Sequence, residues 1–388
     1  MALSRLANIK QLTNPAILIM KPFLAILLLS GLSVMADPVR FYLGTYTENP
    51  LSKGIYTGTL DTRTGALSPI TLAAKAVSPS FLAFSPDRKL VYAAAEGGQG
   101  TVSAFRREAD GSLTLLNEVP SGSVDCHVSV DATGHTVFLA SYGSGNVSAF
   151  SLKQDGSVAQ RTAFIQETGT GPNPARQTQP HLHSMYHDPE NRRVYACDLG
   201  TDHVYIFDYD AATGGLTPAH PPFASVPPGS GPRHLAWSPD GRFAYVNGEM
   251  GLNVTVFSRD AASGALTPIQ TLPTLPPGAD TNGVTTAEIL VHPSGRWLYV
   301  SNRGCGTIEV YSRGADGKLT WVQNAPAQVQ VPRGFGLDPS GQWLLVGGQV
   351  DNKIAVLKID PATGELSATD QTATVGAPVC VIFDALAQ

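Results

Sequence analysis

The sequence predicts an all-β protein, a seven-bladed β-propeller whose blades each contain four antiparallel strands. Three observations lead to this fold class. A strand-rich unit begins again every 46 to 57 residues, a length typical of one propeller blade. The chain contains 39 glycines, 29 prolines and only 15% charged residues, as expected of many short strands joined by turns. No stretch has the periodicity of an amphipathic helix.

Each unit opens with two strands joined by a tight turn. Apolar residues 81–84 precede the turn SPDR at residues 85–88, and a second apolar run follows at residues 90–93. Proline presets φ in such a turn, and aspartate bonds the backbone that follows it. The pattern returns around SPDG at 238–241 and DPSG at 338–341. These segments are predicted to form the inner half of a blade.

The outer half of each unit is a third strand, a glycine-containing turn and a fourth, edge strand. Third strands are expected at residues 102–105, 147–150 and 254–257. Turns such as DGSL at 110–113 and TGEL at 363–366 lead into the edge strands. Four antiparallel strands therefore make up each blade.

The ring is expected to close through the C-terminus. The first unit starts at its second strand, residues 40–45, and the last unit is followed by a surplus strand, residues 379–383. We therefore expect the C-terminal strand to complete the first blade as its inner strand. Residues 37–388 then form one propeller domain in which only short strand edges are exposed.

Aligning the units places two columns of residues in register, and charged side chains are frequent in both. Six pairs lie sixteen residues apart, and ring closure adds a seventh pair. The first column, at the start of the inner strand, contains Val379, Ser80, Cys126, His183, Arg233, Ala287 and Arg333. The second column, at the end of the second strand, contains Tyr46, Glu96, Tyr142, Leu199, Glu249, Arg303 and Gln349. Because these two strands are antiparallel, both columns are expected at one mouth of the central channel. The Gly/Pro-rich loops 167–179 and 272–286 should shape a cleft there.

The column residues predict a site for an acidic ligand. Arg233, Arg303 and Arg333 indicate an anion or a developing oxyanion, because guanidinium groups match carboxylate and phosphate geometry. Glu249 or a histidine of the pair His181 and His183 is the candidate general base. In the competing interpretation, the Arg–Glu pairs only join neighbouring blades.

Residues near the columns extend this site. His181 shares the face of the column histidine, and it is assigned to substrate binding together with Arg333, Glu96 and Glu288. His234 follows a column position by one residue, so its side chain is expected to point away from the channel and to pack or form a hydrogen bond. Cys126 is expected to be a small buried thiol rather than a nucleophile.

Residues 1–36 are predicted to be a secretory signal peptide. The apolar run 23–29 follows Lys21, and Val34-Met35-Ala36 precedes a cleavage site before Asp37. The run is shorter than the roughly 20 residues of a membrane span. Translation could begin at Met1 or at Met20. The mature protein is therefore expected to be periplasmic or secreted, with no membrane attachment after cleavage.

Composition excludes several other functions. The formal net charge is −5 and no basic run is present, so nucleic acid is not an expected partner. The four cysteines lack paired spacing, which argues against a zinc site. No metal or cofactor is expected, and the oligomeric state and disulfide pairing stay open.

Several segments resemble, in order, the lactonase family of seven-bladed propellers, which includes bacterial 6-phosphogluconolactonases and fungal carboxymuconate-lactonizing enzymes. The matching segments are QPHLHS (179–184), DLGTD (198–202), GPRH (231–234), NGE (247–249), AEI (287–289), SNRG (301–304) and PRGF (332–335). They are spread over almost all of the predicted propeller. The sequence departs from the family pattern at Gly248 and at Gly347-Gly348-Gln349.

The resemblance implies a lactone hydrolase of carbohydrate metabolism that is similar to 6-phosphogluconolactonase. Carried over by position, the family's axial site falls on the His181/His183 segment, Arg233, Glu249 and Arg303, with Arg333 nearby. Phosphorylated sugar lactones are cytoplasmic, whereas this chain is predicted to be exported. An unphosphorylated sugar lactone or another small acidic lactone is therefore the expected substrate.

Two other functions fit the same residues. A cycloisomerase of muconate-like acids would also need arginines for carboxylates and one proton-transfer group. A non-enzymatic exported propeller would bind a ligand or a partner without consuming it. Lactone hydrolysis at the channel mouth is the leading hypothesis.

Overall fold

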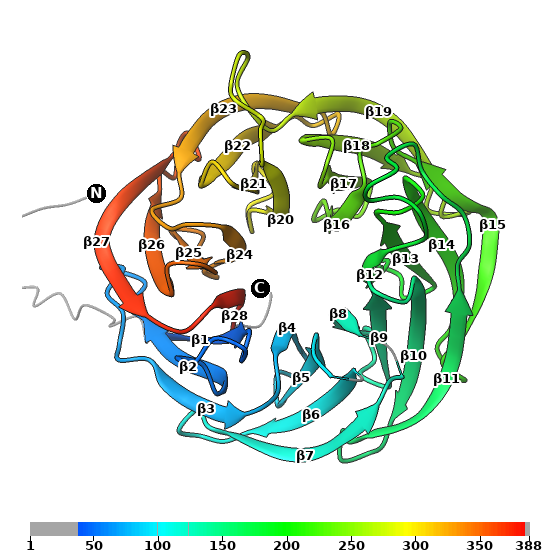
Figure 1. The fold of residues 1–388 in the computed structure, drawn as a ribbon, viewed down its shortest axis with the longest axis horizontal. Coiled ribbons are helices and arrows are strands. Elements are labelled where there is room, and N and C mark those ends of the chain that lie inside the picture. Colours follow the sequence, from blue (N-terminus) through cyan, green and yellow to red (C-terminus); the bar gives the residue numbers. More distant parts are fainter. Residues whose placement is uncertain (1–37, 99, 123, 385–388) are drawn as a thin grey trace, which may run out of the picture. The chain divides into compact units, whose positions relative to one another are not determined.

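The computed structural model describes residues 38–98, 100–122 and 124–384, which form a ring of seven four-stranded antiparallel sheets (Figure 1). The predicted fold class is confirmed. The described residues form no helix, so none of them makes an apolar helix long enough to cross a membrane. The predicted signal peptide, residues 1–36, lies outside the described residues.

Each sheet runs from an inner strand at the ring axis to an outer edge strand. The first three blades in chain order, written from the axis outward, are β28 (Pro378–Phe383), β1 (Val39–Thr45), β2 (Gly54–Leu60) and β3 (Thr71–Lys75); β4 (Pro79–Phe84), β5 (Leu90–Ala95), β6 (Thr101–Arg107) and β7 (Leu113–Pro120); and β8 (Asp125–Val130), β9 (Thr136–Ser141), β10 (Asn146–Leu152) and β11 (Val158–Gln166).

The remaining four blades repeat this order. They are β12 (Leu182–His187), β13 (Arg193–Asp198), β14 (His203–Asp210) and β15 (Gly215–Ser225); β16 (Pro232–Trp237), β17 (Phe243–Gly248), β18 (Asn253–Arg259) and β19 (Leu266–Pro273); β20 (Thr285–Val291), β21 (Trp297–Arg303), β22 (Thr307–Arg313) and β23 (Leu319–Pro326); and β24 (Pro332–Leu337), β25 (Trp343–Gly348), β26 (Lys353–Ile359) and β27 (Leu366–Thr374).

The C-terminal strand closes the ring, as the sequence predicted. β28 pairs antiparallel with β1, in a register that sets Phe383 opposite Phe41. The two rings pack edge to face with centroids 5.8 Å apart. Arg88 Nη1 of the second blade donates a hydrogen bond to the carbonyl of Phe383 at 3.1 Å, and Arg107 forms an ion pair with Asp384. The end of the chain is therefore held by the first two blades together.

Apolar side chains between neighbouring sheets form the core. One core cluster combines Tyr299 and Val310 of the sixth blade with Leu344 and Val346 of the seventh. Buried tyrosine hydroxyls also join the blades, because each donates to a glycine carbonyl in the outer turn of the next blade. These bonds are Tyr42 to Gly111, Tyr92 to Gly156, Tyr195 to Gly264, Tyr245 to Gly317 and Tyr299 to Gly364. Each satisfies a polar group that would be costly to bury unpaired.

All seven inner strands contain a β-bulge near the start. In β4, Pro79 pairs with Ala95 and Phe81 with Ala94, so Ser80 is an extra residue. Equivalent register shifts occur in β8, β12, β16, β20, β24 and β28. The first column of the sequence alignment coincides with these bulges. Bulges redirect side chains, and here they bring the column residues to the axis.

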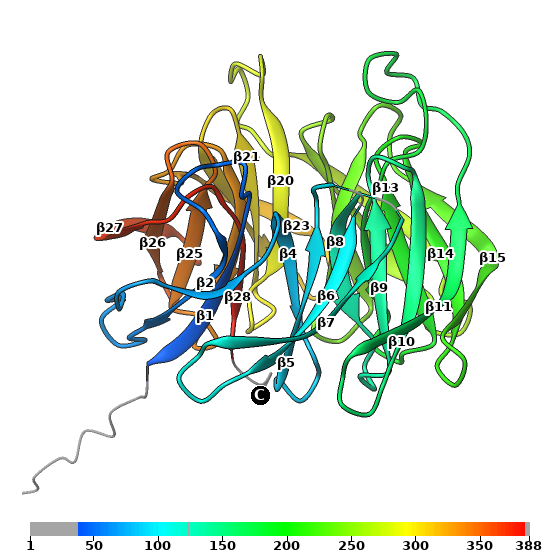
Figure 2. The ribbon, with the colours of Figure 1, turned by 60° about the horizontal axis from the view of Figure 1, so that its bottom comes forward.

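The long loops 167–179 and 272–286 rise from the same side of the ring, at the top of Figure 2. They lead into β12 and β20, and the first-column residues His183 and Ala287 lie near the starts of these strands. The tight turns that join each inner strand to the next strand lie at the opposite side. The ring therefore has a mouth that bears long loops and the columns, and a second face formed by short turns.

We expect Phe383→Ala to lower the free energy of unfolding by about 3 kcal/mol, because it removes a buried ring at the closure of the propeller. Phe383 is 8% exposed, whereas Phe164 on the edge strand β11 is 48% exposed. Phe164→Ala is therefore the matched control, with a change below about 1 kcal/mol. Urea denaturation of both variants checks this, and equal effects would show that ring closure contributes little.

Candidate active site

Residues from all seven blades meet at the axis. They surround a small cavity of about 10 Å³, close to the volume needed for a single water molecule. The lining residues are Ser80, Phe81, Glu96, Cys126, His183, Arg233, His234, Glu288, Arg333 and Val379. Members of both columns are among them, which confirms that the columns meet at one place. A lactone is too large for this cavity, so any such ligand would have to sit above it, at the mouth.

Glu249 is the centre of the cluster and contacts three arginines. Its Oε1 accepts a hydrogen bond from Arg176 Nη2 at 2.8 Å. Its Oε2 accepts one from Arg233 Nε at 3.1 Å and lies 3.0 Å from Arg303 Nη2. Arg233 extends from the bulge of β16, and Arg303 ends β21 of the next blade. One carboxylate thus joins two blades and a loop.

The charge state of this cluster is fixed by its geometry. Burial alone would raise the pKa of Glu249, but the charges of Arg303 and Arg233 and the hydrogen bond from Arg176 lower it to about 2. Burial lowers the pKa of Arg303 to about 10, which leaves the guanidinium protonated at neutral pH. Glu249 is therefore an anion throughout the physiological range, and a weak base.

Beneath Glu249, His234 and Glu288 form a buried pair that supports Arg233. His234 Nδ1 lies 2.7 Å from Glu288 Oε1, and Arg233 Nη1 lies 3.2 Å from His234 Nε2. Because a guanidinium can only donate, Nε2 accepts and the Nδ1 proton is donated to Glu288. The expectation that His234 points away from the channel is wrong, because the bulge in β16 turns both Arg233 and His234 toward the axis. The expected hydrogen bond is present.

Burial also decides the ionisation of this lower layer. It lowers the pKa of His234 and of His183 well below the usual value, with a further contribution from the charge of Arg233. It raises the pKa of Glu288 to about 7. The imidazole of His183 is therefore neutral at pH 7 and can accept a proton.

Cys126 lies beside His183, with Sγ and Nδ1 3.8 Å apart. Burial raises the pKa of the Cys126 thiol far above its usual value. A thiolate is the reactive form of cysteine, so the structure agrees with the prediction that this residue packs and does not attack. The ring of His183 also lies beside the ring of His234, with centroids 5.2 Å apart.

A second charged group stands on the other side of the axis. Arg333 Nη2 lies 3.5 Å from Glu96 Oε2, and the Arg333 guanidinium lies over the ring of Tyr46 at 5.3 Å. The Tyr46 hydroxyl donates to the same Glu96 oxygen at 2.6 Å. Arg333 and Glu96 come from column positions, as predicted, and the pair is more exposed than Arg233.

His181 lies at the mouth, above His183. Its ring stacks on Tyr142 with centroids 4.4 Å apart, and its Nδ1 lies 2.8 Å from the carbonyl oxygen of Tyr142. The backbone of His181 donates to Asp198 Oδ1 at 2.6 Å. Asp198 thus fixes the entrance to β12, and His181 is placed where a ligand at the mouth could reach it.

Exposure divides the cluster into two layers. Arg233 is 2% exposed, whereas the side chains of Arg303 and Arg333 are each 15% exposed. His183, Glu249 and Glu288 are buried with Arg233. The arginines of the upper layer can touch a ligand directly, and the lower layer holds them in place.

Sequence reasoning missed Arg176, the most exposed arginine of the cluster, at 38%. It lies on the loop 167–179, outside the repeated unit, so no alignment of blades could place it. The available signal was a charged residue within a Gly/Pro-rich loop that was expected to shape the cleft. Tyr142 was in the second column but was not singled out; its hydroxyl accepts a hydrogen bond from Arg176 Nη2 at 2.9 Å.

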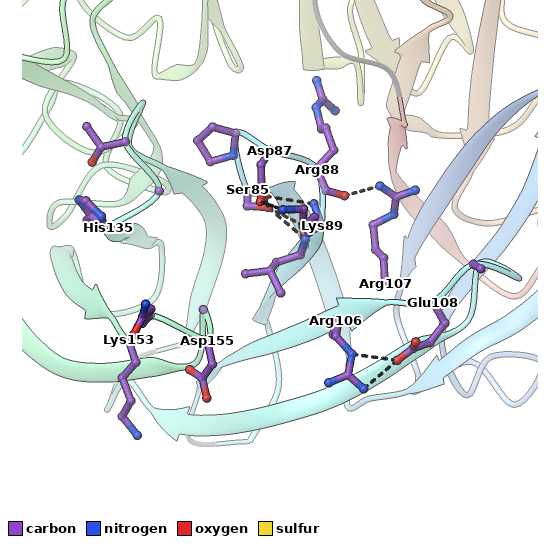
Figure 3. A pocket seen from close by; sticks show the side chains of 17 residues that line it. Ser85, Asp87, Arg88, Lys89, Arg106, Arg107, Glu108, His135, Lys153 and Asp155 are labelled. Atoms are coloured by element: carbon purple, nitrogen blue, oxygen red, sulfur yellow. Dashed lines mark hydrogen bonds and ion pairs between the residues drawn. The ribbon is translucent and has the colours of Figure 1, made fainter.

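A larger cleft of about 780 Å³ opens on the opposite face, between the second and third blades (Figure 3). Two pairs of its charged side chains contact one another. Arg106 bonds Glu108 at 3.0 Å, and Lys89 lies 3.3 Å from Asp87. The cleft contains none of the column residues, so its size alone does not make it the site. No cluster of side chains in the described part of the chain could hold a metal ion.

Comparisons with known proteins identify relatives over almost the whole propeller. Residues 40–383 match the family model described as lactonase, 7-bladed beta-propeller. The 6-phosphogluconolactonase of Bacillus subtilis is 35% identical over 346 residues, which cover 88% of this chain and 97% of the relative. The structure of Pseudomonas aeruginosa periplasmic gluconolactonase has 30% sequence identity and a TM-score of 0.85, over 90% of this chain and all of that one (100%). The 6-phosphogluconolactonase of Serratia proteamaculans is 32% identical and covers 83% of this chain and 93% of the relative.

We expect Glu249→Gln to lower the free energy of unfolding at pH 7 by about 3–5 kcal/mol, because it leaves buried guanidinium groups without a counter-charge. The pKa of Glu249 lies below its ordinary value of 4.5. The stability it contributes is therefore present above pH 4.5 and is lost as the pH falls toward 2. The variant should lack this part of the acid dependence.

Urea denaturation between pH 2 and pH 7 measures both effects. Glu190→Gln is the matched control, because Glu190 bonds Arg259 at a partly exposed position and should contribute about 1 kcal/mol or less. Equal losses in the two variants would contradict the central role of Glu249.

Proposed function

Because the chain belongs to the lactonase family of seven-bladed β-propellers, we propose that it hydrolyses a small sugar-type or acidic lactone at the mouth of the axial channel. One observation carries this proposal. Three arginines converge on the single carboxylate of Glu249, which leaves positive charge beside an accessible mouth. That charge suits the oxyanion that forms when a lactone carbonyl is attacked, and the carboxylate of the product.

Arg303 is the residue best suited to stabilise the oxyanion. Its Nη2 is committed to Glu249 and to the carbonyl of Thr286. Its Nε is buried and has no hydrogen-bond partner among the described residues. A buried donor without a partner is costly, and the 15% of the side chain that is exposed is what a ligand can contact. Arg333, at the same depth, would contact a hydroxyl or acid group of the substrate, and His181 and Glu96 would contact its outer part.

His183 is the general base in this proposal. Glu249 is a poor candidate, because both of its oxygens are bound to guanidinium groups and its pKa is about 2. The neutral imidazole of His183 lines the axial cavity, which has room for one water molecule. A water activated there would lie below a lactone at the mouth.

The reaction then balances without a cofactor. His183 takes a proton from the water, and the water oxygen bonds to the ring carbonyl carbon. The bond from that carbon to the ring oxygen breaks, and the proton passes to the ring oxygen. The products are a hydroxyl and a carboxylic acid on one open chain, and the acid releases its remaining proton to solvent to become a carboxylate. In this proposal Glu249, His234 and Glu288 orient the arginines and do not touch the reacting atoms.

The choice among lactones rests on two points. A periplasmic gluconolactonase is similar over almost the whole chain, and residues 1–36 have the pattern of a signal peptide. Both support an exported enzyme that acts on an unphosphorylated sugar lactone or another small acidic lactone.

We expect Arg303→Ala to lower kcat by about 10²–10³, since it removes the proposed oxyanion donor. The measurement is acid release in a pH-stat by residues 37–388, with glucono-δ-lactone, 6-phosphogluconolactone, an acyl-homoserine lactone and a muconolactone as substrates. The control is Arg242→Ala, because Arg242 is an exposed arginine on the opposite face and pairs with Asp240. No saturable hydrolysis of any lactone by the folded wild-type protein would exclude the proposal.

The pH profile tests the base. His183 must be neutral to accept a proton, and burial lowers its pKa well below 6.5. We therefore expect kcat/KM to stay level from pH 7.5 down to 6.5 and to fall only at lower pH. His183→Asn should lower kcat by about 10²–10⁴ and remove that acidic limb. An unchanged limb in the variant would assign the base to another group.

A further inference from the structure

The loop 167–179 is a fixed structure built around one buried amide side chain. Gln177 is 1% exposed, and its Nε2 donates to the carbonyl of Leu199 at 2.9 Å. Its Oε1 accepts the backbone N–H of Asn173 at 2.9 Å, and the backbones of Gly171 and Gln177 are bonded to each other at 2.9 Å. A side chain at Gly171 would lie 2.5 Å from Gln177. The residue next to Gln177 is thereby held over the mouth.

That residue is Arg176, and only part of its guanidinium is used. Nη2 bonds Glu249 Oε1 at 2.8 Å and the Tyr142 hydroxyl at 2.9 Å. Its other two nitrogens, Nε and Nη1, have no partner in the part of the chain that the structure describes. With 38% of its side chain exposed, Arg176 presents these donors to the entrance, whereas Arg233 below it is closed off.

The charges around Glu249 are unbalanced. Arg176, Arg233 and Arg303 contribute three positive charges against the one negative charge of Glu249. Glu288, whose pKa burial raises to about 7, adds at most one more negative charge below Arg233. Arg333 and Glu96 form a separate pair nearby. Reaction at a lactone carbonyl creates one negative charge, beside Arg303. An anionic group near Arg176 would pair with the positive charge that remains at the exposed guanidinium.

We propose that Arg176 binds an anionic substituent of the substrate, a carboxylate or phosphate borne at a distance from the lactone ring, and so determines a preference for acidic over neutral lactones. The inference rests on the proposed hydrolysis and adds a substrate class and a specificity residue to it. Nε and Nη1 lie on opposite edges of the guanidinium, so either one can donate a single charge-assisted hydrogen bond to a carboxylate or a phosphate. The shape of the loop means that this donor is in place before the substrate arrives.

The test compares matched lactones in Arg176→Ala and wild type. The neutral substrate is glucono-δ-lactone, the carboxylate substrate is a glucaro-lactone and the phosphate substrate is 6-phosphogluconolactone. We expect KM for the preferred anionic lactone to rise about tenfold or more, as for one lost charge-assisted hydrogen bond. KM for the neutral lactone should rise less than about threefold on the same scale, so the ratio of the anionic to the neutral KM reports the contact with the anion. The anionic lactone whose KM rises in Arg176→Ala shows whether Arg176 binds a carboxylate or a phosphate.

Two controls separate specificity from structure. Arg242→Ala removes an exposed arginine from the opposite face and should leave all KM values unchanged. Arg176→Lys keeps the charge but not the planar guanidinium, so it should restore part of the affinity for the anionic lactone only. Equal losses for neutral and anionic lactones in Arg176→Ala would overturn the inference, because they would mean that Arg176 acts only through Glu249.

Calorimetry with the open-chain anions gluconate, glucarate and 6-phosphogluconate provides a readout that does not need turnover. Weaker binding of glucarate or 6-phosphogluconate, each of which carries an anionic group that gluconate lacks, by Arg176→Ala, with unchanged gluconate binding, would support the anion site even if no lactone were hydrolysed. Binding of all three anions that is insensitive to Arg176 would overturn it, even if hydrolysis were confirmed.

Discussion

The carboxylate of Glu249 is the interaction on which the rest of the axial cluster depends. Like-charged guanidinium groups can share a buried space only when an anion lies between them. Glu249 takes this place for Arg176, Arg233 and Arg303, and His234 and Glu288 fix Arg233 from below. The same contacts that hold the arginines together prevent Glu249 from acting as a base. Its role is therefore to keep the arginines charged and directed at the mouth.

Ring geometry makes this convergence possible. Each inner strand begins with a bulge, so residues that would alternate between the faces of a regular strand turn together toward the axis. Closure by β28 fixes the circumference, because one blade is built from both ends of the described chain. The bulges and the closure of the ring therefore together determine where the charged groups lie at the axis.

The repeat made the fold and most of the cluster predictable from sequence. The constant spacing of sixteen residues between the two columns was enough to identify Glu249, Arg233, Arg303 and Arg333. In each blade this spacing joins the start of the inner strand to the end of the antiparallel second strand, and these two points lie at the same mouth of the channel. His234 was misjudged, since one extra residue in a bulge leaves the apolar pattern of the strand intact. Arg176 was missed because the bonds of Gln177 to Leu199 and Asn173 set its loop, and no periodicity records such long-range contacts.

The most direct test of this account is the structure of residues 37–388 bound to glucono-δ-lactam, a lactone analogue whose amide resists hydrolysis. The account predicts a ring at the loop-bearing mouth, with the lactam oxygen within hydrogen-bond distance of Arg303 and the ring above the cavity lined by His183. A lactam bound only in the cleft of the opposite face, or a mouth that stays empty at saturating concentration, would contradict the assignment of the site.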